Sequence, residues 1–118
     1  MKSGQISTLI TEGRAYKSSS FLFKVMKSDS FDASTRNVAF LAPKKQFKTA
    51  VLRNKARRRA RSALCAVCFD IYSTSTPLKF KEYYILFNLY LNILTVDFKE
   101  LKNEVRQVLD KSGILNTL

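Results

Sequence analysis

The sequence predicts a small α+β protein, an α/β sandwich in which helices pack on one small central sheet. Three short runs rich in aromatic and β-branched residues, 21–26, 38–42 and 83–90, are typical of strands. Apolar residues recur at helical spacing after Thr49 and again from Phe98 onwards. The chain has 118 residues, 46% of them hydrophobic, which suits one domain with a single core over its whole length, 1–118.

The first third of the chain predicts a short helix followed by two strands. Residues 6–10 form an apolar cluster that ends near Gly13, which indicates one or two helical turns. Residues 14–20 are polar and rich in serine, so we expect a loop there, with a further strand as the alternative. The runs 21–26 and 38–42 flank a polar link and suggest a hairpin.

Residues 49–72 predict a long basic helix, with Thr49 as its N-cap. At about 100° per residue, Arg58 lies opposite the apolar stripe, whereas Arg53 and Lys55 border the stripe on its two sides. The stripe itself is thin, because alanine fills much of it. It consists of Leu52, Ala56, Ala60, Leu64, Val67 and Ile71.

The last third predicts a strand and a helix. Residues 83–90 are apolar almost without interruption, as expected of a strand that is buried on both faces. The closing helix has Thr95 as its expected N-cap and Gly113 as its expected stop. Residues 91–95 are a second place where a further strand is an alternative.

Charge is concentrated between Lys44 and Arg61, where nine of eighteen residues are basic and none is acidic. The whole chain has a net charge of +12, which favours a polyanionic partner such as nucleic acid or an anionic membrane. A solvated helix that serves solubility alone is the alternative. Nine uncompensated like charges repel one another in the free protein, which disfavours this solubility-only interpretation. A role at a membrane surface is also disfavoured, because the basic helix lacks the large apolar face that membrane-surface helices use.

The sequence has no residue pattern that would support catalysis by the protein itself. The chain has no His, and its three Gly do not form a phosphate-binding loop. Cys65 and Cys68 have CxxC spacing but no further Cys or His for zinc, so we expect two reduced, mostly buried residues and no cofactor in the protein itself. No segment is typical of a membrane span or a secretory signal, which indicates a cytoplasmic protein.

Strand aromatics allow two interpretations, core packing or stacking of unpaired bases. Alternation along the first strand places Phe21, Phe23 and Val25 on one face. Lys24 shares the other face with Leu22 and Met26. Because Lys24 is charged, we expect part of that face to meet solvent or RNA.

The basic segment resembles the signature of the bacterial ribonuclease P protein subunit, a Lys-Lys pair, an apolar residue and an Arg-Asn-Arg core followed by further basic residues. The matching positions are Lys44-Lys45-x-Phe47-x-x-Ala50-Val51-x-Arg53-Asn54-Lys55-x-Arg57-Arg58-x-x-Arg61. The neighbouring elements also agree in order, so the resemblance covers nearly the whole chain. Here the core reads Arg53-Asn54-Lys55, which keeps the charge but loses one guanidinium fork.

The resemblance implies a left-handed βαβ crossover and a role in Mg²⁺-dependent removal of the 5′ leader from precursor tRNA. In this family the RNA subunit performs the hydrolysis with its Mg²⁺ ions, and we expect one protein per RNA. The resemblance implies contacts to the catalytic RNA from Lys44, Lys45, Arg53, Asn54, Lys55 and Arg58. We expect Lys48 to take part as well, because it extends the same cationic array across the loop before the helix. The resemblance implies contacts to the leader strand, in a cleft between sheet and basic helix, from Arg57, Arg61, Phe21 and Lys24.

One departure concerns the leader. The family's first helix usually offers Phe side chains to it, whereas this chain has Ile6 and Ile10 there. Two other functions stay open from the residues alone. One is a ribosomal-type protein that holds rRNA without an enzymatic role, and the other is an autonomous nuclease, which the missing His and carboxylate cluster disfavour.

Overall fold

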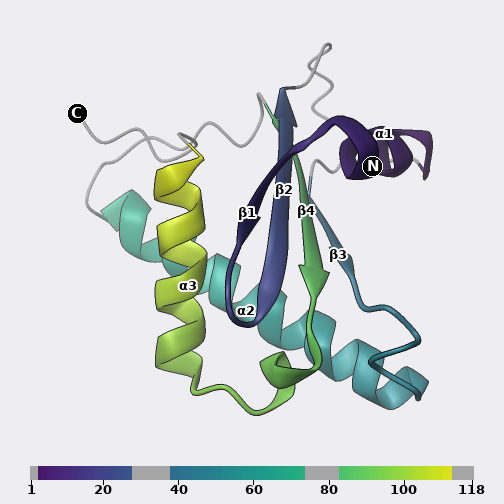
Figure 1. Cartoon of the computed structure of the whole chain (residues 1–118). Helices are drawn as coiled ribbons and strands as arrows, with labels where there is room; N and C mark the ends of the chain where they lie inside the picture. The colour runs from purple at the N-terminus through teal and green to yellow at the C-terminus, as the bar shows by residue number, and fades with distance from the viewer. Residues whose placement is uncertain (1–2, 28–37, 74–82, 113–118) are drawn as a thin grey trace.

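The computed structural model describes residues 3–27, 38–73 and 83–112. Its elements follow in the order helix, three strands, helix, strand, 3₁₀ turn and helix (Figure 1), which confirms the α+β class. They are α1 (Ser3–Glu12), β1 (Arg14–Lys17), β2 (Phe21–Lys27), β3 (Val38–Leu41), α2 (Ala50–Ser73), β4 (Tyr83–Leu89), η2 (Leu91–Leu94) and α3 (Phe98–Lys111). The alternative of a further strand is confirmed at β1, whereas η2 takes the place of a strand after β4.

The four strands form one mixed sheet in the order β1-β2-β4-β3. β1 and β4 run antiparallel to β2, and β3 runs parallel to β4. The predicted hairpin between the second and third strands is therefore wrong, because β4 lies between them. The physical reason is burial: β4 is buried on both faces and belongs in the centre of the sheet, whereas the short β3 forms an edge.

The connection from β3 through α2 to β4 crosses over with the rarer hand. In Figure 1 β4 points downward with β3 parallel to it on its right, and α2 passes behind the sheet. A chain that moves from β3 to β4 by this route follows a left-handed path, against the usual right-handed rule. The crossover that the family resemblance implies is thus confirmed.

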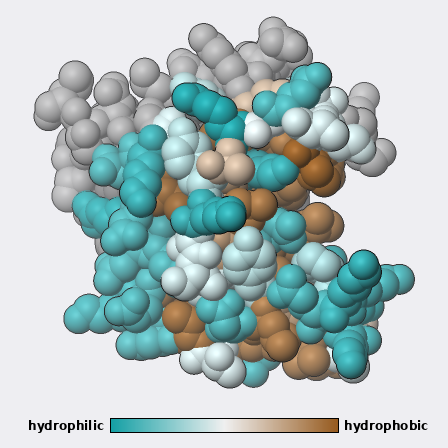
Figure 2. Space-filling model, viewed as in Figure 1, coloured by the Kyte–Doolittle hydropathy of each residue, from teal (hydrophilic) through white to brown (hydrophobic). Residues whose placement is uncertain are grey.

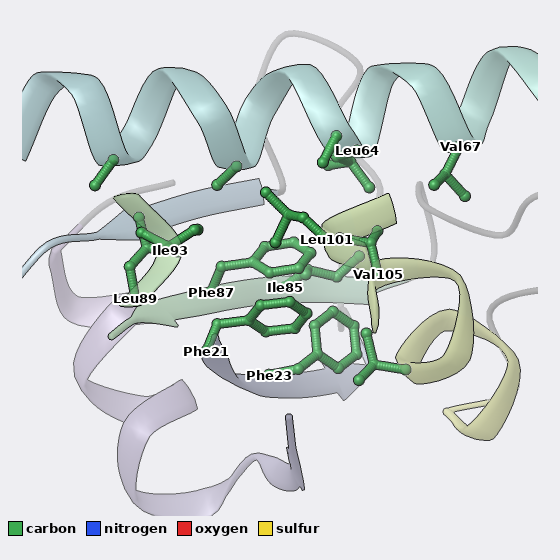
Figure 3. Close-up of a cluster of buried hydrophobic side chains, with 14 of the residues drawn as sticks. Phe21, Phe23, Leu64, Val67, Ile85, Phe87, Leu89, Ile93, Leu101 and Val105 are labelled. Carbon is green, nitrogen blue, oxygen red and sulfur yellow. The ribbon is translucent and has the colours of Figure 1, made fainter. Parts of the chain in front are cut away.

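The main core lies between the sheet and the pair α2 and α3. Phe87 is its centre, because its ring contacts three other rings: Phe21 at 5.1 Å, Phe23 at 5.1 Å and, in a stacked arrangement, Phe40 at 5.2 Å between centroids. Figure 3 shows the rings of Phe21, Phe23 and Phe87 under α2, with Leu101 beside them. The predicted alternation along β2 is confirmed, since Phe21, Phe23 and Val25 are all at most 1% exposed.

Helix α2 approaches the sheet closely because alanines line its inner side. Ala56, Ala60 and Ala63 are at most 3% exposed, and Leu64 and Val67 continue the buried stripe. The predicted cap is confirmed, because the Thr49 hydroxyl accepts a hydrogen bond from the Leu52 amide at 3.2 Å. The side chain of Ile71, which completes the predicted stripe, lies outside the described part of the chain.

Helix α1 covers part of the opposite face of the sheet. Its buried Leu9 packs with Tyr84 and Leu86 in a second, smaller core. The helix ends at Gly13, as predicted, and the Gly13 amide donates to the Leu9 carbonyl at 2.9 Å. A Cβ atom at Gly13 would lie 2.4 Å from that carbonyl oxygen, so the turn requires glycine.

Helix α3 begins two residues later than predicted from Thr95. Asp97 is its N-cap and accepts a hydrogen bond from the Lys99 amide, whereas Thr95 belongs to the turn that follows η2 and donates its hydroxyl to Asn92. The predicted stop at Gly113 lies outside the described residues. The Glu104 carboxylate ties the helix to the β1–β2 turn by accepting three hydrogen bonds, from the Ser18 hydroxyl and from the amide and hydroxyl of Ser20.

Candidate nucleic-acid interface

The basic segment forms one loop and the first half of α2. Six of its nine cations are exposed and three are half-buried. The exposed ones are Lys44, Lys45, Lys48, Lys55, Arg58 and Arg61, and the half-buried ones are Arg53, Arg57 and Arg59. Figure 2 shows the hydrophilic surface over the part of this loop that faces the viewer, at the lower right. No acid interrupts the segment, so its surface is cationic throughout.

The loop before α2 is held in a defined shape. The Phe47 side chain is fully buried and its amide donates to the Pro43 carbonyl at 2.9 Å. One guanidinium nitrogen of Arg53 donates to the Phe47 carbonyl at 3.0 Å, and the side-chain oxygen of Gln46 accepts from the Leu91 amide at 2.8 Å. Lys44, Lys45 and Lys48 therefore project from an ordered backbone.

The cations of α2 lie on two flanks and an outer face, as the helical spacing predicts. On one flank the Arg61 guanidinium lies over the Phe40 ring of β3, 5.7 Å from its centroid. On the other flank Arg59 donates to the Val96 carbonyl just before α3. Arg58 is exposed on the outer face between them. The helix thus presents charge toward β3, toward α3 and outward.

Arg53 and Asn54, at the centre of the matching motif, have different surroundings. Arg53 is half-buried, and its bond to the Phe47 carbonyl occupies one of the five guanidinium donors, which leaves the others for a partner. Asn54 is exposed, and its side-chain oxygen accepts a hydrogen bond from Arg57 at 3.4 Å. Arg53 therefore shapes the loop as well as contributing charge.

The residues expected on the leader strand do not form one surface. Phe21 is wrong as a contact residue, because its side chain is 1% exposed and packs against Phe87 in the core. Lys24 is half-buried on the α1 side of the sheet and donates to the carbonyl of Ile10, near the end of that helix. Arg57 and Arg61 lie on α2, which covers the other side of the sheet.

The expected cleft between the sheet and the basic helix is also wrong. The buried side chains of α2 belong to one core cluster with those of β4 and β2, so the core fills the space between helix and sheet. Charge and aromatic surface meet instead at the edge of the sheet, where Arg61 lies over the half-buried Phe40. Most other strand aromatics are core residues, because Phe23, Phe87 and Tyr84 are all at most 8% exposed.

Two residues that the sequence does not identify as site residues, Gln46 and Phe98, contribute to the surroundings of the basic segment. Gln46 connects the basic loop to η2, and Phe98 at the start of α3 is 36% exposed with the Lys102 ammonium 5.8 Å from its ring centroid. The sequence feature that could have identified Phe98 is the amphipathic spacing of α3, which places this residue near the border of the apolar stripe. Gln46 offers no such signal in the sequence.

The cysteines are both free, and only one has the expected burial. Cys65 is exposed, which corrects the expectation of a mostly buried pair, because this position lies near the outer face of α2. Cys68 is half-buried, and burial, together with the neighbouring Cys65 thiol, raises its pKa to about 11. The described residues contain no group of His, Cys, Asp and Glu side chains that could hold a metal ion.

Among the described residues, no helix is both long enough and apolar enough to cross a bilayer. A comparison with curated protein sequences gives no significant match.

Solved structures match the fold over nearly the whole chain. The RNase P protein of Staphylococcus aureus aligns with a TM-score of 0.65 and 16% identity over 98% of this chain and 95% of that one. A mutant of the Staphylococcus aureus protein, described as defective in mRNA degradation activity, aligns with a TM-score of 0.70 and 16% identity over 98% and 87% of the two chains. The RNase P protein of Thermotoga maritima, solved with a fluorophenyl thiourea, gives 0.64 and 18% over 91% and 92%.

The TM-scores establish a shared fold, and the match of a family model to the sequence establishes the family. The family model described as Ribonuclease P matches residues 1–113, which include the basic segment, the sheet and the helices α1, α2 and α3. The chain therefore belongs to the ribonuclease P protein family.

Proposed function

We propose that the protein binds the RNA subunit of a bacterial ribonuclease P and assists it in removing the 5′ leader of precursor tRNA. Family membership gives it an RNA partner in a ribonucleoprotein. The observation that carries the proposal is the fixed array of cations on the β3–α2 loop and the first half of α2, uninterrupted by any acid. We propose a cytoplasmic complex with one protein per RNA.

Phosphate is the chemistry that this array suits. Arginine presents a planar fork of donors that matches a phosphate group with two hydrogen bonds. Each phosphate neutralised releases roughly 0.7 to 0.9 counterion from a nucleic acid, which is worth about 1 kcal/mol of affinity at 0.15 M salt. Because the loop and the helix cap hold the backbone in place, little conformational entropy is lost when the array binds.

The proposal assigns the hydrolysis and the Mg²⁺ ions to the RNA subunit. The chain has no His to act as general base. The described acids do not gather into a metal-binding group, and Glu104 is engaged in hydrogen bonds to the β1–β2 turn. The contribution of the protein is then affinity for RNA and reduced repulsion between phosphates, which lowers the Mg²⁺ concentration that the ribozyme needs.

Within the array we propose two roles. Arg53, Asn54 and Lys55, with Arg58 and the loop lysines, hold the catalytic RNA. Arg57 and Arg61 guide the leader strand along the β3 edge, where the guanidinium of Arg61 lies over an aromatic ring. A guanidinium plane on an aromatic ring leaves its other side open to an unpaired base.

Cleavage of precursor tRNA at low Mg²⁺ by the RNA subunit, with and without the protein, tests the proposal. We expect no cleavage by the protein alone and restored cleavage by the complex. Arg53→Ala/Lys55→Ala should weaken RNA binding and flatten its salt dependence, whereas Arg57→Ala/Arg61→Ala should raise the KM for leader-bearing substrate more than for a substrate with a single-nucleotide leader.

Three results would contradict this reading. Absence of binding to the RNA subunit at moderate salt would exclude the main function. Metal-dependent cleavage by RNA-free protein would indicate an autonomous nuclease. Equal effects of the two double variants on assembly and on KM would exclude the two separate roles while leaving RNA binding intact.

A further inference from the structure

We infer that the seam between α2 and α3 is a second site for the RNA backbone, on the opposite flank of α2 from Arg57 and Arg61. The inference rests on the proposed function and extends it to residues of α3, which lie outside the motif. We define the α2–α3 seam by five residues that the two helices place along it: Lys55, Arg59, Phe98, Lys99 and Lys102. Its ligand class is a sugar-phosphate chain of structured RNA.

The orientation of α3 follows from its acidic flank. Glu104 accepts hydrogen bonds from Ser18 and Ser20, so this flank of α3 faces the β1–β2 turn. At about 100° per residue, Lys102 lies on the other side of the buried stripe from Glu104, and Phe98 lies in the half of the stripe that is nearer Lys102. That side is turned toward α2, against which α3 packs.

Arg59 brings the matching flank of α2 to the same place. Its guanidinium donates to the Val96 carbonyl, two residues before α3 begins. Its Nε atom is buried and finds no hydrogen-bond partner among the described residues. Lys55 lies one turn earlier on the same flank and is exposed. The two helices therefore present cations to a common seam.

The start of α3 adds an aromatic surface to this charge. Lys102 is held over the Phe98 ring, 5.8 Å from its centroid, and the ring remains 36% exposed. Lys99 is exposed beside them. The acids of α3 lie off this flank: Glu100 and Glu104 follow each other by about one turn on the side that faces the β1–β2 turn, and Asp110 lies more than two turns further along the helix. Asp97, at the N-cap, accepts a hydrogen bond from the Lys99 amide.

A second site follows from the dimensions of α2. The seam and the Arg57 flank lie on opposite sides of a helix that is about 10–12 Å across with its side chains. One phosphodiester chain that follows one flank does not reach the other. Two backbone segments of a folded RNA can meet both flanks at once, which favours the structured RNA subunit over a single leader strand as the occupant.

Two double variants of equal charge test the seam. Lys99→Ala/Lys102→Ala removes two seam cations, whereas Lys17→Ala/Lys111→Ala removes two lysines that lie on the edge strand β1 and at the end of α3. Binding of each to ribonuclease P RNA transcribed from the same genome is measured from 0.05 to 0.4 M salt, and thermal unfolding verifies that each variant folds.

We expect the seam variant to bind about 10- to 30-fold more weakly at 0.15 M salt and its salt slope to fall by about 1.4 to 1.8. The control variant should lose less than about threefold. Indistinguishable variants would overturn the seam while leaving the proposed function intact, provided that Arg53→Ala/Lys55→Ala still weakens binding. Failure of the wild-type protein to bind this RNA would overturn both.

Discussion

Arg58 and Arg59 are neighbours of identical chemistry, and the structure predicts opposite consequences for their replacement by alanine. Arg58 is exposed on the outer face of α2. Arg59 is half-buried and donates a hydrogen bond from its guanidinium to the Val96 carbonyl, which ties α2 to the chain entering α3. Alanine has the highest helix propensity, so neither change weakens α2 itself.

The expected magnitudes follow from these surroundings. Arg59→Ala loses a hydrogen bond from a charged donor, at a cost of about 1.5–3 kcal/mol, together with the packing of the arginine stem. In a domain of 118 residues each kcal/mol lowers Tm by roughly 3–5 °C, so we expect Tm to fall by about 5–15 °C. Arg58→Ala should change stability by at most about 0.5 kcal/mol and weaken RNA binding about fivefold at 0.15 M salt.

Thermal unfolding followed by circular dichroism measures the first effect, and fluorescence anisotropy with the RNA subunit measures the second. Arg59→Met serves as a control, because it keeps most of the apolar stem and loses only the donors. It should fall between wild type and Arg59→Ala in Tm. The reasoning is refuted if Arg59→Ala unfolds at the wild-type temperature, or if both alanine variants lower Tm equally.

Three further predictions concern the rest of the fold. Glu104→Gln should cost about 1–3 kcal/mol in unfolding free energy, because the new amide group faces donors that bind both carboxylate oxygens; an unchanged urea midpoint would contradict this. Gly13→Ala should cost about 1–3 kcal/mol, because its Cβ meets the Leu9 carbonyl at 2.4 Å, whereas Gly4→Ala provides a helical control. Iodoacetamide at pH 8 should modify the exposed Cys65 well before Cys68, whose pKa of about 11 keeps it protonated; equal rates by mass spectrometry would exclude that difference.

Local patterns predicted most elements of the fold, and the errors concern partners and boundaries. The strand from Phe21 was identified by composition, but its pairing with β4 was not, because composition does not show which strands are neighbours. The sequence favours Thr95 as the start of α3 because threonine is a common N-cap, whereas in the structure η2 occupies the chain up to Leu94 and Asp97 caps the helix.

The candidate site shows the same division. Exposure of Arg58 follows from helical spacing, since this residue lies opposite the apolar stripe. The expectation that Phe21 contacts the leader strand is wrong, because an aromatic residue in a strand gives the same sequence pattern whether its face of the sheet is covered by RNA or by a helix. The tie between Arg59 and Val96 joins residues 37 positions apart, and no local pattern indicates it.

The sequence by itself determined the α+β class, the long basic helix and the cationic character of its surface, because helical periodicity and charge are local properties of the chain. Only the tertiary structure decided which cations remain free for a partner. Packing of α2 on the sheet and of α3 beside it buries one side of the basic helix and uses Arg53 and Arg59 partly to hold neighbouring segments. The physical reason is that hydrogen bonding and burial depend on contacts between distant segments, which come together only in the folded chain.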